Sequence, residues 1–127
     1  MVAKQMCPCD SGRAYAECCG RWHAGSPAPD ALSLMRSRYS AFALSLERYL
    51  LDTWHPSKRP ASVPFETNRK WLGLRIVDSR VTGDDSAEVE FIARSKASNA
   101  AAVRLHERSR FVREGGRWFY VDGELLE

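Results

Sequence analysis

The sequence contains no long apolar run, no cluster of basic residues and no glycine-rich loop of the kind that cradles phosphate groups. No apolar stretch approaches the roughly 20 residues of a membrane-spanning helix. Basic residues never exceed two in a row, as in Lys58-Arg59, and Lys plus Arg number 19 against 16 for Asp plus Glu. These features exclude a membrane span and argue against nucleic acid as a partner.

An export signal is also missing, because the stretch from Met1 to Met6 is too short and too polar to be a signal peptide before Cys7. We therefore expect a cytoplasmic protein, whose thiols stay reduced. The 127 residues are 44% hydrophobic and 28% charged, which is typical of a globular protein. They suit one domain with a small appendage.

All four cysteines of the chain fall close together, at Cys7, Cys9, Cys18 and Cys19. Four thiolates satisfy the tetrahedral preference of zinc and leave no open position for a substrate. The turn at 10–12 sends the chain away between the two cysteine pairs. We therefore predict a structural site with Zn²⁺ as cofactor. Because large apolar residues are few before residue 25, removing the metal is expected to unfold residues 7–23 and spare the rest.

Other uses of these cysteines stay open. Two disulfides would suit a secreted protein, but no export signal precedes them. The thiols could also be free. His23 follows Cys19 by four residues, a metal-compatible spacing, so it could replace one cysteine as a ligand. Four thiolates around zinc leave a net negative charge, which Lys4, Arg13 and Arg21 could offset.

The stretch from Cys7 to Gly20 resembles the SEC-C motif, the zinc knuckle at the C-terminus of the SecA translocation ATPase and at the ends of many unrelated bacterial proteins. The resemblance implies a small zinc domain over residues 1–25 that contacts another protein. Asp10 departs from the motif, which more often has glycine there, and aspartate tolerates a left-handed backbone only at some cost. Residues 20–29 are interpreted as a linker, from which Trp22 pins the knuckle onto the main domain.

An apolar stripe predicts helical structure over residues 29–54, as two helices or one bent helix. Its members recur at three- and four-residue steps: Leu32, Met35, Tyr39, Phe42 and Leu46. Pro29 and Asp30 favour a helix start, and Pro56 disfavours helix at the residue before it. Residues 56–68 contain three prolines and are expected to form a loop near a pocket.

From residue 71 onward the apolar residues alternate, which predicts strands. We expect four of them, over 71–76, 87–93, 103–112 and 118–121, with a polar loop at 95–100 and turns at 83–86 and 114–117. Leu72, Leu74 and Ile76 should share one face. Successive strands with short connections indicate an antiparallel meander, and helices covering one face give an α+β domain.

The motifs Leu34–Phe42, Tyr49–Pro56, Leu105–Phe111 and Gly116–Gly123, together with the knuckle, resemble the YchJ-like family. Members of that family join an N-terminal SEC-C motif to an NTF2-like domain. The resemblance implies that residues 26–127 form an NTF2-like cone, in which a curved antiparallel sheet of about four strands wraps round N-terminal helices and leaves a cavity. It assigns no activity.

Strand alternation places Glu107 and Ser109 on the face of Leu105 and Phe111. If that face is concave, a carboxylate lies in an apolar pocket and could act as a general acid or base. Alternatively, Arg36 or Arg38 from the covering helix pairs with Glu107 and only orients the helix. The candidate pocket residues are Arg36, Tyr39, Trp54, His55, Glu107 and Tyr120.

Two main hypotheses follow. In the first, the protein is an adaptor that binds another protein through its zinc knuckle and forms a possible homodimer through its sheet. In the second, it is a small NTF2-like enzyme or ligand-binding protein acting on an apolar small molecule, with Glu107 as acid or base. A nucleic-acid binder that uses Arg104, Arg108 and Arg110 ranks last, because acidic residues are interleaved with these arginines.

Overall fold

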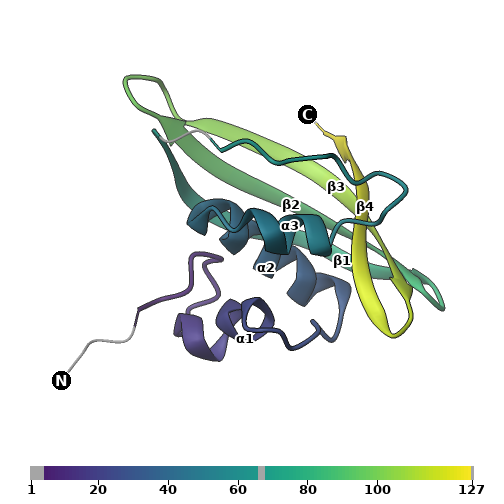
Figure 1. Ribbon diagram of the computed structural model, residues 1–127. Coiled ribbons are helices and arrows are strands. Elements are labelled where there is room, and N and C mark those ends of the chain that lie inside the picture. The colour runs from purple at the N-terminus through teal and green to yellow at the C-terminus, as the bar shows by residue number, and fades with distance from the viewer. Residues whose placement is uncertain (1–4, 66–67, 127) are drawn as a thin grey trace.

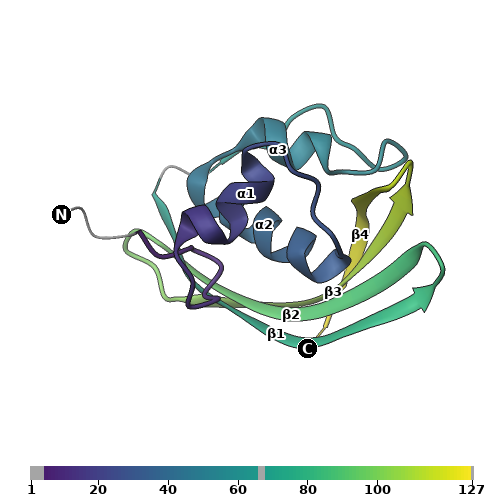
Figure 2. The ribbon, with the colours of Figure 1, turned by 90° about the horizontal axis from the view of Figure 1, so that it is seen from below.

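The computed structural model describes residues 5–65 and 68–126 (Figure 1). The elements run in the order η1 (Tyr15–Glu17), α1 (Cys19–His23), α2 (Ala31–Leu44), α3 (Glu47–Asp52), β1 (Arg69–Gly83), β2 (Ser86–Ala97), β3 (Val103–Glu114) and β4 (Arg117–Leu125). The strands form one antiparallel sheet of order β1-β2-β3-β4. Figure 2 shows this sheet curving round the helices, with α2 against its concave face. The predicted α+β class and the four-stranded meander are confirmed.

The predicted helical region divides into two helices, α2 and α3. Asp30 lies one residue before α2 and caps it, since its carboxylate accepts a hydrogen bond from the Ser33 backbone N–H at 2.7 Å. Ser45 ends α2 in a left-handed conformation, with φ 59° and ψ 47°. The turn at Ser45 lets α3 fold back beside α2.

Helix α2 is buried on more than one side, which the apolar stripe did not predict. Ser37 and Ser40 are completely buried, and Arg38 is only 4% exposed. The reason is visible in Figure 2, where α2 lies between the sheet, α3 and the N-terminal segment that contains α1. Several polar side chains of α2, including Ser37, Arg38 and Ser40, are therefore buried against other elements and do not mark a solvent face.

Strand β1 corrects one prediction. Its pairing with β2 shifts register between Trp71 and Gly73, so Leu72 does not share a face with Leu74 and Ile76. Leu72 is 44% exposed, whereas Leu74 is buried. A β-bulge of this kind inserts one residue and inverts the alternation on one side of it.

Two predicted loops are shorter than expected. Strand β2 continues to Ala97, so the loop predicted from residue 95 begins later. Helix α1 occupies the start of the predicted linker at 20–29 and ends at His23. The turn at 114–117 is as predicted, because Gly115 and Gly116 have φ values of 60° and 78°, which favour glycine.

The main core joins the N-terminal segment to the sheet. All four cysteines pack in the same buried cluster as Leu34, Met35 and Tyr39 of α2 and Phe111 of β3. A second, smaller cluster forms around Leu50, between α2, α3 and the loop that follows. Across residues 5–65 and 68–126, no helix combines the length and apolar character that crossing a membrane requires.

Candidate metal centre and cavity

The knuckle, by which we mean residues 5–23, is shaped by a tight turn. Met6 and Ala14 form an antiparallel bridge across it. Asp10 and Gly12 both have left-handed backbones, with φ values of 66° and 83°. Asp10, which stands where the SEC-C motif usually has glycine, therefore has a backbone conformation that favours glycine. The turn brings the first cysteine pair back to the second.

The four cysteine sulfurs form a compact cluster. All lie within 4.8 Å of one another, and those of Cys9 and Cys18 are 3.6 Å apart. The residues are at most 7% exposed and form no disulfides, so the disulfide alternative is wrong for this structure. Zn–S bonds of about 2.3 Å would place the sulfurs of a tetrahedron about 3.8 Å apart. The cluster therefore fits a metal ion with four sulfur ligands.

The thiols differ in how readily they lose a proton. Hydrogen bonding with the Cys19 thiol lowers the pKa of Cys9 to about 4. The same hydrogen bond raises the pKa of Cys19, and burial raises that of Cys18. Among these three thiols Cys9 therefore loses its proton most readily, and a cation among the sulfurs would favour deprotonation of the others by compensating the charge.

Arg36 corrects one predicted site. It lies at the cysteine cluster, not in the pocket for which it was predicted, and its Nη1 is 3.0 Å from the Cys9 carbonyl oxygen and 3.8 Å from the Cys9 sulfur. Arg21 donates from Nε to the Cys18 carbonyl at 3.1 Å. Lys4, also predicted to offset the thiolate charge, lies outside the described residues. Arg36 therefore places a positive charge beside a cysteine sulfur. The sequence analysis did not predict this contact, because Arg36 is 17 residues beyond the last cysteine.

His23 uses both ring nitrogens away from the cysteines. Its Nε2 donates to the Ser37 carbonyl at 2.8 Å, and since a carbonyl can only accept, Nδ1 accepts from the Tyr15 hydroxyl at 2.6 Å. The ring packs edge-on against Tyr49, with centroids 4.6 Å apart. The group among the described residues that could hold a metal ion consists of the four cysteines and does not include His23. In this structure His23 therefore fastens the knuckle to α2, which corrects the alternative in which it replaces a cysteine ligand.

The outer side of the knuckle carries a surface groove of about 270 Å³, which we call the knuckle groove. Arg13, Arg21, Arg36 and Trp22 line part of it. The guanidinium of Arg21 lies 4.4 Å from the ring centre of Trp22. Trp22 lines this groove and also a second hollow that contains Tyr49 and Trp118 of the main domain, so its role in pinning the knuckle stays a prediction; His23 supplies hydrogen bonds that hold the knuckle.

Between α2 and the concave face of the sheet lies a cavity of about 280 Å³, which we call the inner cavity. Its walls are mainly aromatic and come from α2, β1, β2, β3 and β4 and from the loop after α3. The lining residues are Met35, Arg38, Tyr39, Phe42, Trp54, Trp71, Phe91, Ala93, Leu105, Glu107, Ser109 and Tyr120. Four of the six predicted pocket residues, Tyr39, Trp54, Glu107 and Tyr120, meet here.

Glu107 is held in place by its neighbours on the sheet. Its Oε2 accepts a hydrogen bond from the Ser109 hydroxyl at 2.6 Å. Gly123 lies opposite Ser109 on β4, and a Cβ atom at Gly123 would stand 2.3 Å from the same Oε2. Only glycine leaves room for the carboxylate in this position. Within the described chain no arginine or lysine forms an ion pair with Glu107, so the predicted pairing with Arg36 or Arg38 is absent there.

Arg38 instead anchors the loop after α3. Its Nη1 donates to the Leu50 carbonyl at 2.8 Å and to the Thr53 hydroxyl at 2.7 Å. Its guanidinium lies 4.5 Å from the ring centre of Tyr120 and 4.9 Å from that of Trp54. Burial lowers the pKa of Arg38 to about 10, with Glu107 partly opposing this shift. Burial and then the charge of Glu107 raise the pKa of Tyr120 to about 12.

His55 is the second predicted pocket residue that lies elsewhere. Its Nε2 is 2.8 Å from Glu114 and its Nδ1 is 2.7 Å from the Ser57 hydroxyl. Its ring packs on Phe119, with centroids 6.0 Å apart. His55 follows the helix end, where the backbone turns toward the β3–β4 hairpin, so it stabilises that connection and does not line the inner cavity.

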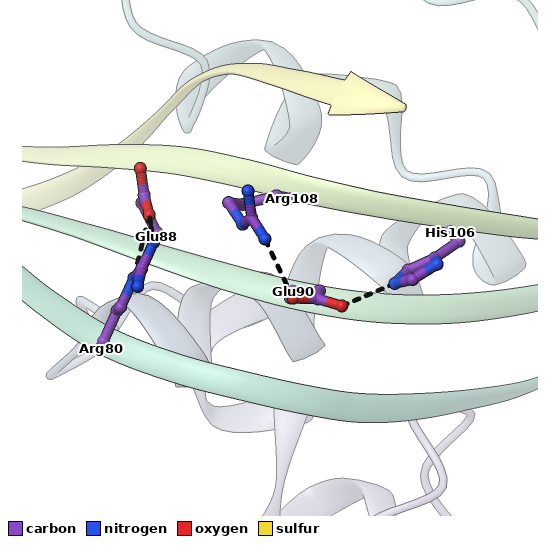
Figure 3. Close-up of polar contacts among 5 residues, drawn as sticks. All are labelled: Arg80, Glu88, Glu90, His106 and Arg108. Carbon is purple, nitrogen blue, oxygen red and sulfur yellow. Dashed lines mark hydrogen bonds and ion pairs between the residues drawn. The ribbon is translucent and has the colours of Figure 1, made fainter. Parts of the chain in front are cut away.

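The convex face of the sheet carries charges paired across strands (Figure 3). Arg80 contacts Glu88 at 2.8 Å, and Glu90 contacts His106 at 2.7 Å and Arg108 at 3.3 Å. Bonding with His106 lowers the pKa of Glu90. His106 therefore faces away from Glu107, as strand alternation predicts.

Two of the arginines proposed for nucleic acid are paired on this face. Arg108 contacts Glu90, and Arg110 forms two hydrogen bonds with Asp122. The bonds to Arg110 lower the pKa of Asp122. Because acids neutralise these side chains, the surface is a poor match for a phosphate backbone. A homodimer through the sheet stays a prediction.

Comparison with known proteins agrees with this architecture. A family model described as the YchJ middle, NTF2-like domain matches residues 30–123, and the SEC-C motif matches residues 4–21. A UPF0225 protein of Polaromonas sp. is 56% identical over 127 residues, covering 93% of this chain and 91% of its own. A UPF0225 protein of Methylibium petroleiphilum is 60% identical over 122 residues, covering 93% and 88%.

A solved structure is also similar. The solution structure of RPA3114, a SEC-C motif containing protein from Rhodopseudomonas palustris, superposes with a TM-score of 0.82 at 33% identity. The match covers 95% of this chain and 98% of that one. The knuckle and the α+β domain therefore occur together in the same arrangement in another protein.

Proposed function

This chain belongs to the YchJ-like family, which joins a SEC-C motif to an NTF2-like domain, and we propose that it binds a small molecule in the inner cavity. The geometry favours this over an adaptor role, which the sequence alone placed first. The cavity combines aromatic walls with a few fixed polar groups, and this composition is typical of ligand sites. Binding and not catalysis is proposed because Ser109, the hydroxyl beside Glu107, is only 1% exposed.

The observation that carries the proposal is an unsatisfied donor. The indole Nε1 of Trp54 is buried and has no hydrogen-bond partner within the described residues. A buried polar group without a partner costs about 1–3 kcal/mol, and such groups are rare in native proteins. Trp54 lines the inner cavity beside Tyr120, with ring centroids 5.2 Å apart. A ligand with a hydrogen-bond acceptor would satisfy this donor.

In this proposal the knuckle is a scaffold that packs behind α2, the helix that forms one wall of the cavity. Zinc is the metal we propose, because a four-thiolate shell suits it and leaves no catalytic position. We keep residues 1–25 and 26–127 as the two proposed domains. The cysteines share a core with Met35 and Tyr39, which also line the cavity. Metal binding would therefore fix the position of α2 as well as fold the knuckle.

The test is a fragment titration followed by NMR, with phenol, benzyl alcohol and cyclohexanol as probes. We expect at least one probe to shift the Trp54 indole N–H signal, which Trp54→Phe identifies. Glu107→Gln should weaken that probe about tenfold, the scale expected when one charge-assisted hydrogen bond is lost. Arg104→Gln on the opposite face of the same strand is the matched control. A folded protein whose cavity signals ignore all three probes at millimolar concentration would disprove the proposal.

Gly123 provides a second, sharper variant. In Gly123→Ala the new Cβ displaces the Glu107 carboxylate while leaving its charge and the strand backbone intact. We expect Gly123→Ala to weaken the same probe and to lower the stability by about 1 kcal/mol, because the displaced carboxylate also loses its hydrogen bond with the buried Ser109 hydroxyl. Equal binding by Gly123→Ala and wild type would show that the placement of Glu107 does not matter.

An adaptor role through the knuckle is the second candidate, and the knuckle groove favours it. Arg13, Arg21 and Arg36 line this groove beside Cys18 and Cys19, and their three positive charges exceed the two net negative charges of Zn²⁺ with four thiolates, which suits an acidic segment of another protein. Arg13→Glu with Arg21→Glu should abolish capture of an Asp/Glu-rich test peptide, while Arg104→Glu should not. Unchanged capture would remove this candidate and leave the cavity proposal untouched.

A further inference from the structure

The side chains around the cysteine sulfurs come from both the knuckle and helix α2. Polar side chains lie beside the sulfurs of Cys7, Cys9 and Cys18, and two of them, Arg36 and Ser40, belong to α2. We propose that α2 is part of the metal site, and that Arg36 and Ser40 stabilise the thiolate ligands and thereby raise the affinity for the metal. This inference concerns the metal centre alone, so its failure would leave the ligand proposed for the inner cavity untouched.

Arg36 and Ser40 are four residues apart, so they project from the same side of α2. Nη1 of Arg36 is 3.0 Å from the Cys9 carbonyl oxygen and 3.8 Å from the Cys9 sulfur, so one nitrogen contacts both atoms. The Ser40 hydroxyl lies 3.5 Å from the Cys7 sulfur. A thiolate has no proton to donate, so with Cys7 deprotonated Ser40 is the donor. The first cysteine pair is thus bonded to the main domain as well as to the knuckle.

Ser11 provides a comparison from within the knuckle. Its Oγ accepts a hydrogen bond from the Arg13 backbone N–H at 3.2 Å and lies 3.1 Å from the Cys18 sulfur. With Cys18 as a thiolate, the Ser11 hydroxyl donates to it. A knuckle removed from α2 would keep this bond and lose the contacts of Arg36 and Ser40. The donors to the first cysteine pair therefore depend on how the knuckle docks.

Burial makes these donors important. Cys9 is completely buried and Cys7 is 6% exposed, so water has little access to either residue. Zn²⁺ with four thiolates carries two net negative charges, and a buried charge is costly unless hydrogen bonds or opposite charges replace its hydration. Helix α2 packs in the same core cluster as the cysteines and helps to exclude the water. Arg36 and Ser40 supply, from that helix, the donors that the water would have provided.

The experiment measures how tightly the metal-loaded, full-length protein holds Zn²⁺ against a chromophoric chelator. Arg36→Gln and Ser40→Ala should each weaken zinc binding at least about tenfold, the scale expected when a hydrogen-bond partner of a metal ligand is removed. Two control variants should bind zinc as tightly as wild type does. Arg48→Gln removes the same charge from an exposed position. Ser37→Ala removes a buried hydroxyl of α2 that bonds with the Tyr49 hydroxyl.

Cobalt separates a direct effect on the sulfurs from a loss of structure. In the Co²⁺-loaded protein, the sulfur-to-cobalt charge-transfer band should move to longer wavelength in Arg36→Gln and Ser40→Ala, because a thiolate that has lost its donor gives up electron density more easily. The d–d bands, which report tetrahedral coordination, should be retained. An unchanged charge-transfer band in both variants would overturn the inference, because the two residues would then act only through packing. Wild-type zinc affinity in both variants, or an equal loss of affinity in Ser37→Ala, would overturn it as well.

Discussion

Replacing His23 with phenylalanine tests whether this residue fastens the knuckle or binds the metal. Phenylalanine keeps a ring of similar size against Tyr49 but removes the hydrogen bonds to Tyr15 and to the Ser37 carbonyl. At about 1 kcal/mol for each lost bond, the variant should lose about 2 kcal/mol of unfolding free energy. For a chain of this length that is a fall in Tm of about 8 °C, measured by calorimetry in excess zinc.

The metal content of the same variant provides the decisive comparison. His23→Phe should retain its metal, because all four cysteines are intact, whereas Cys19→Ser should lose it. Metal analysis after gel filtration measures both. If His23→Phe releases its metal as readily as Cys19→Ser, then His23 is a ligand and our assignment of its two nitrogens is wrong.

The pH dependence gives an independent check on His23. Burial lowers the pKa of His23 below its ordinary 6.5, although the bond to the Ser37 carbonyl partly opposes this. As the pH falls, His23 of the unfolded chain therefore binds a proton at a higher pH than His23 of the folded protein does. The stability linked to His23 is thus present above pH 6.5 and is lost below it. His23→Phe should lack this component in denaturant titrations at constant metal saturation. Parallel pH profiles for the two proteins would refute the burial argument.

Three further predictions concern stability. Chelating the metal should lower the melting temperature of the sheet as well as the knuckle, because the cysteines share its core; this revises the expectation from the sequence that residues outside 7–23 would be spared, and hydrogen exchange that changes only in residues 5–23 would contradict it. Ser45→Gly should stabilise the protein by about 1 kcal/mol in urea unfolding, since φ is positive there, and Ser45→Ala should give no gain. The pKa values of Glu90 and Asp122 in the folded protein are lower than their ordinary values of 4.5 and 3.8. The two carboxylates therefore stabilise the protein at pH values above 4.5 and 3.8, and this stability is lost as the pH falls. Glu90→Gln with Asp122→Asn should therefore flatten the acid limb of the stability profile, and an unchanged limb would exclude this contribution.

Features set by local chemistry could be predicted from the sequence. Cysteine spacing predicted a compact group of four thiols that could hold a metal ion, and the departure at Asp10 correctly drew attention to a left-handed position. Strand alternation predicted that Glu107 and Ser109 share a face, and in the structure that face lines the inner cavity; the glycines at 115–116 marked the last hairpin. Each of these predictions depends on a few neighbouring residues, and the sequence rule behind it has a direct geometric cause.

Features set by packing around α2 could not be predicted. Arg36 and Arg38 are two residues apart and were both candidates for Glu107, yet one lies at the cysteines and the other lines the cavity. Periodicity cannot separate them, because a helix buried on two sides has no polar face. The bulge at Leu72 did leave a signal, since Gly73 interrupts the strand there and an isolated glycine often marks such a site.

Helix α2 is a wall common to the metal centre and the cavity. Arg36, Ser37 and Ser40 contact the knuckle, while Arg38 and Tyr39 face the cavity. If the proposed metal and the proposed ligand both fix the position of α2, we expect their affinities to be coupled, and thermodynamic reciprocity then makes each change the other by the same factor. Competition with a chelator can therefore report ligand binding without any label on the ligand, as slower or weaker loss of metal.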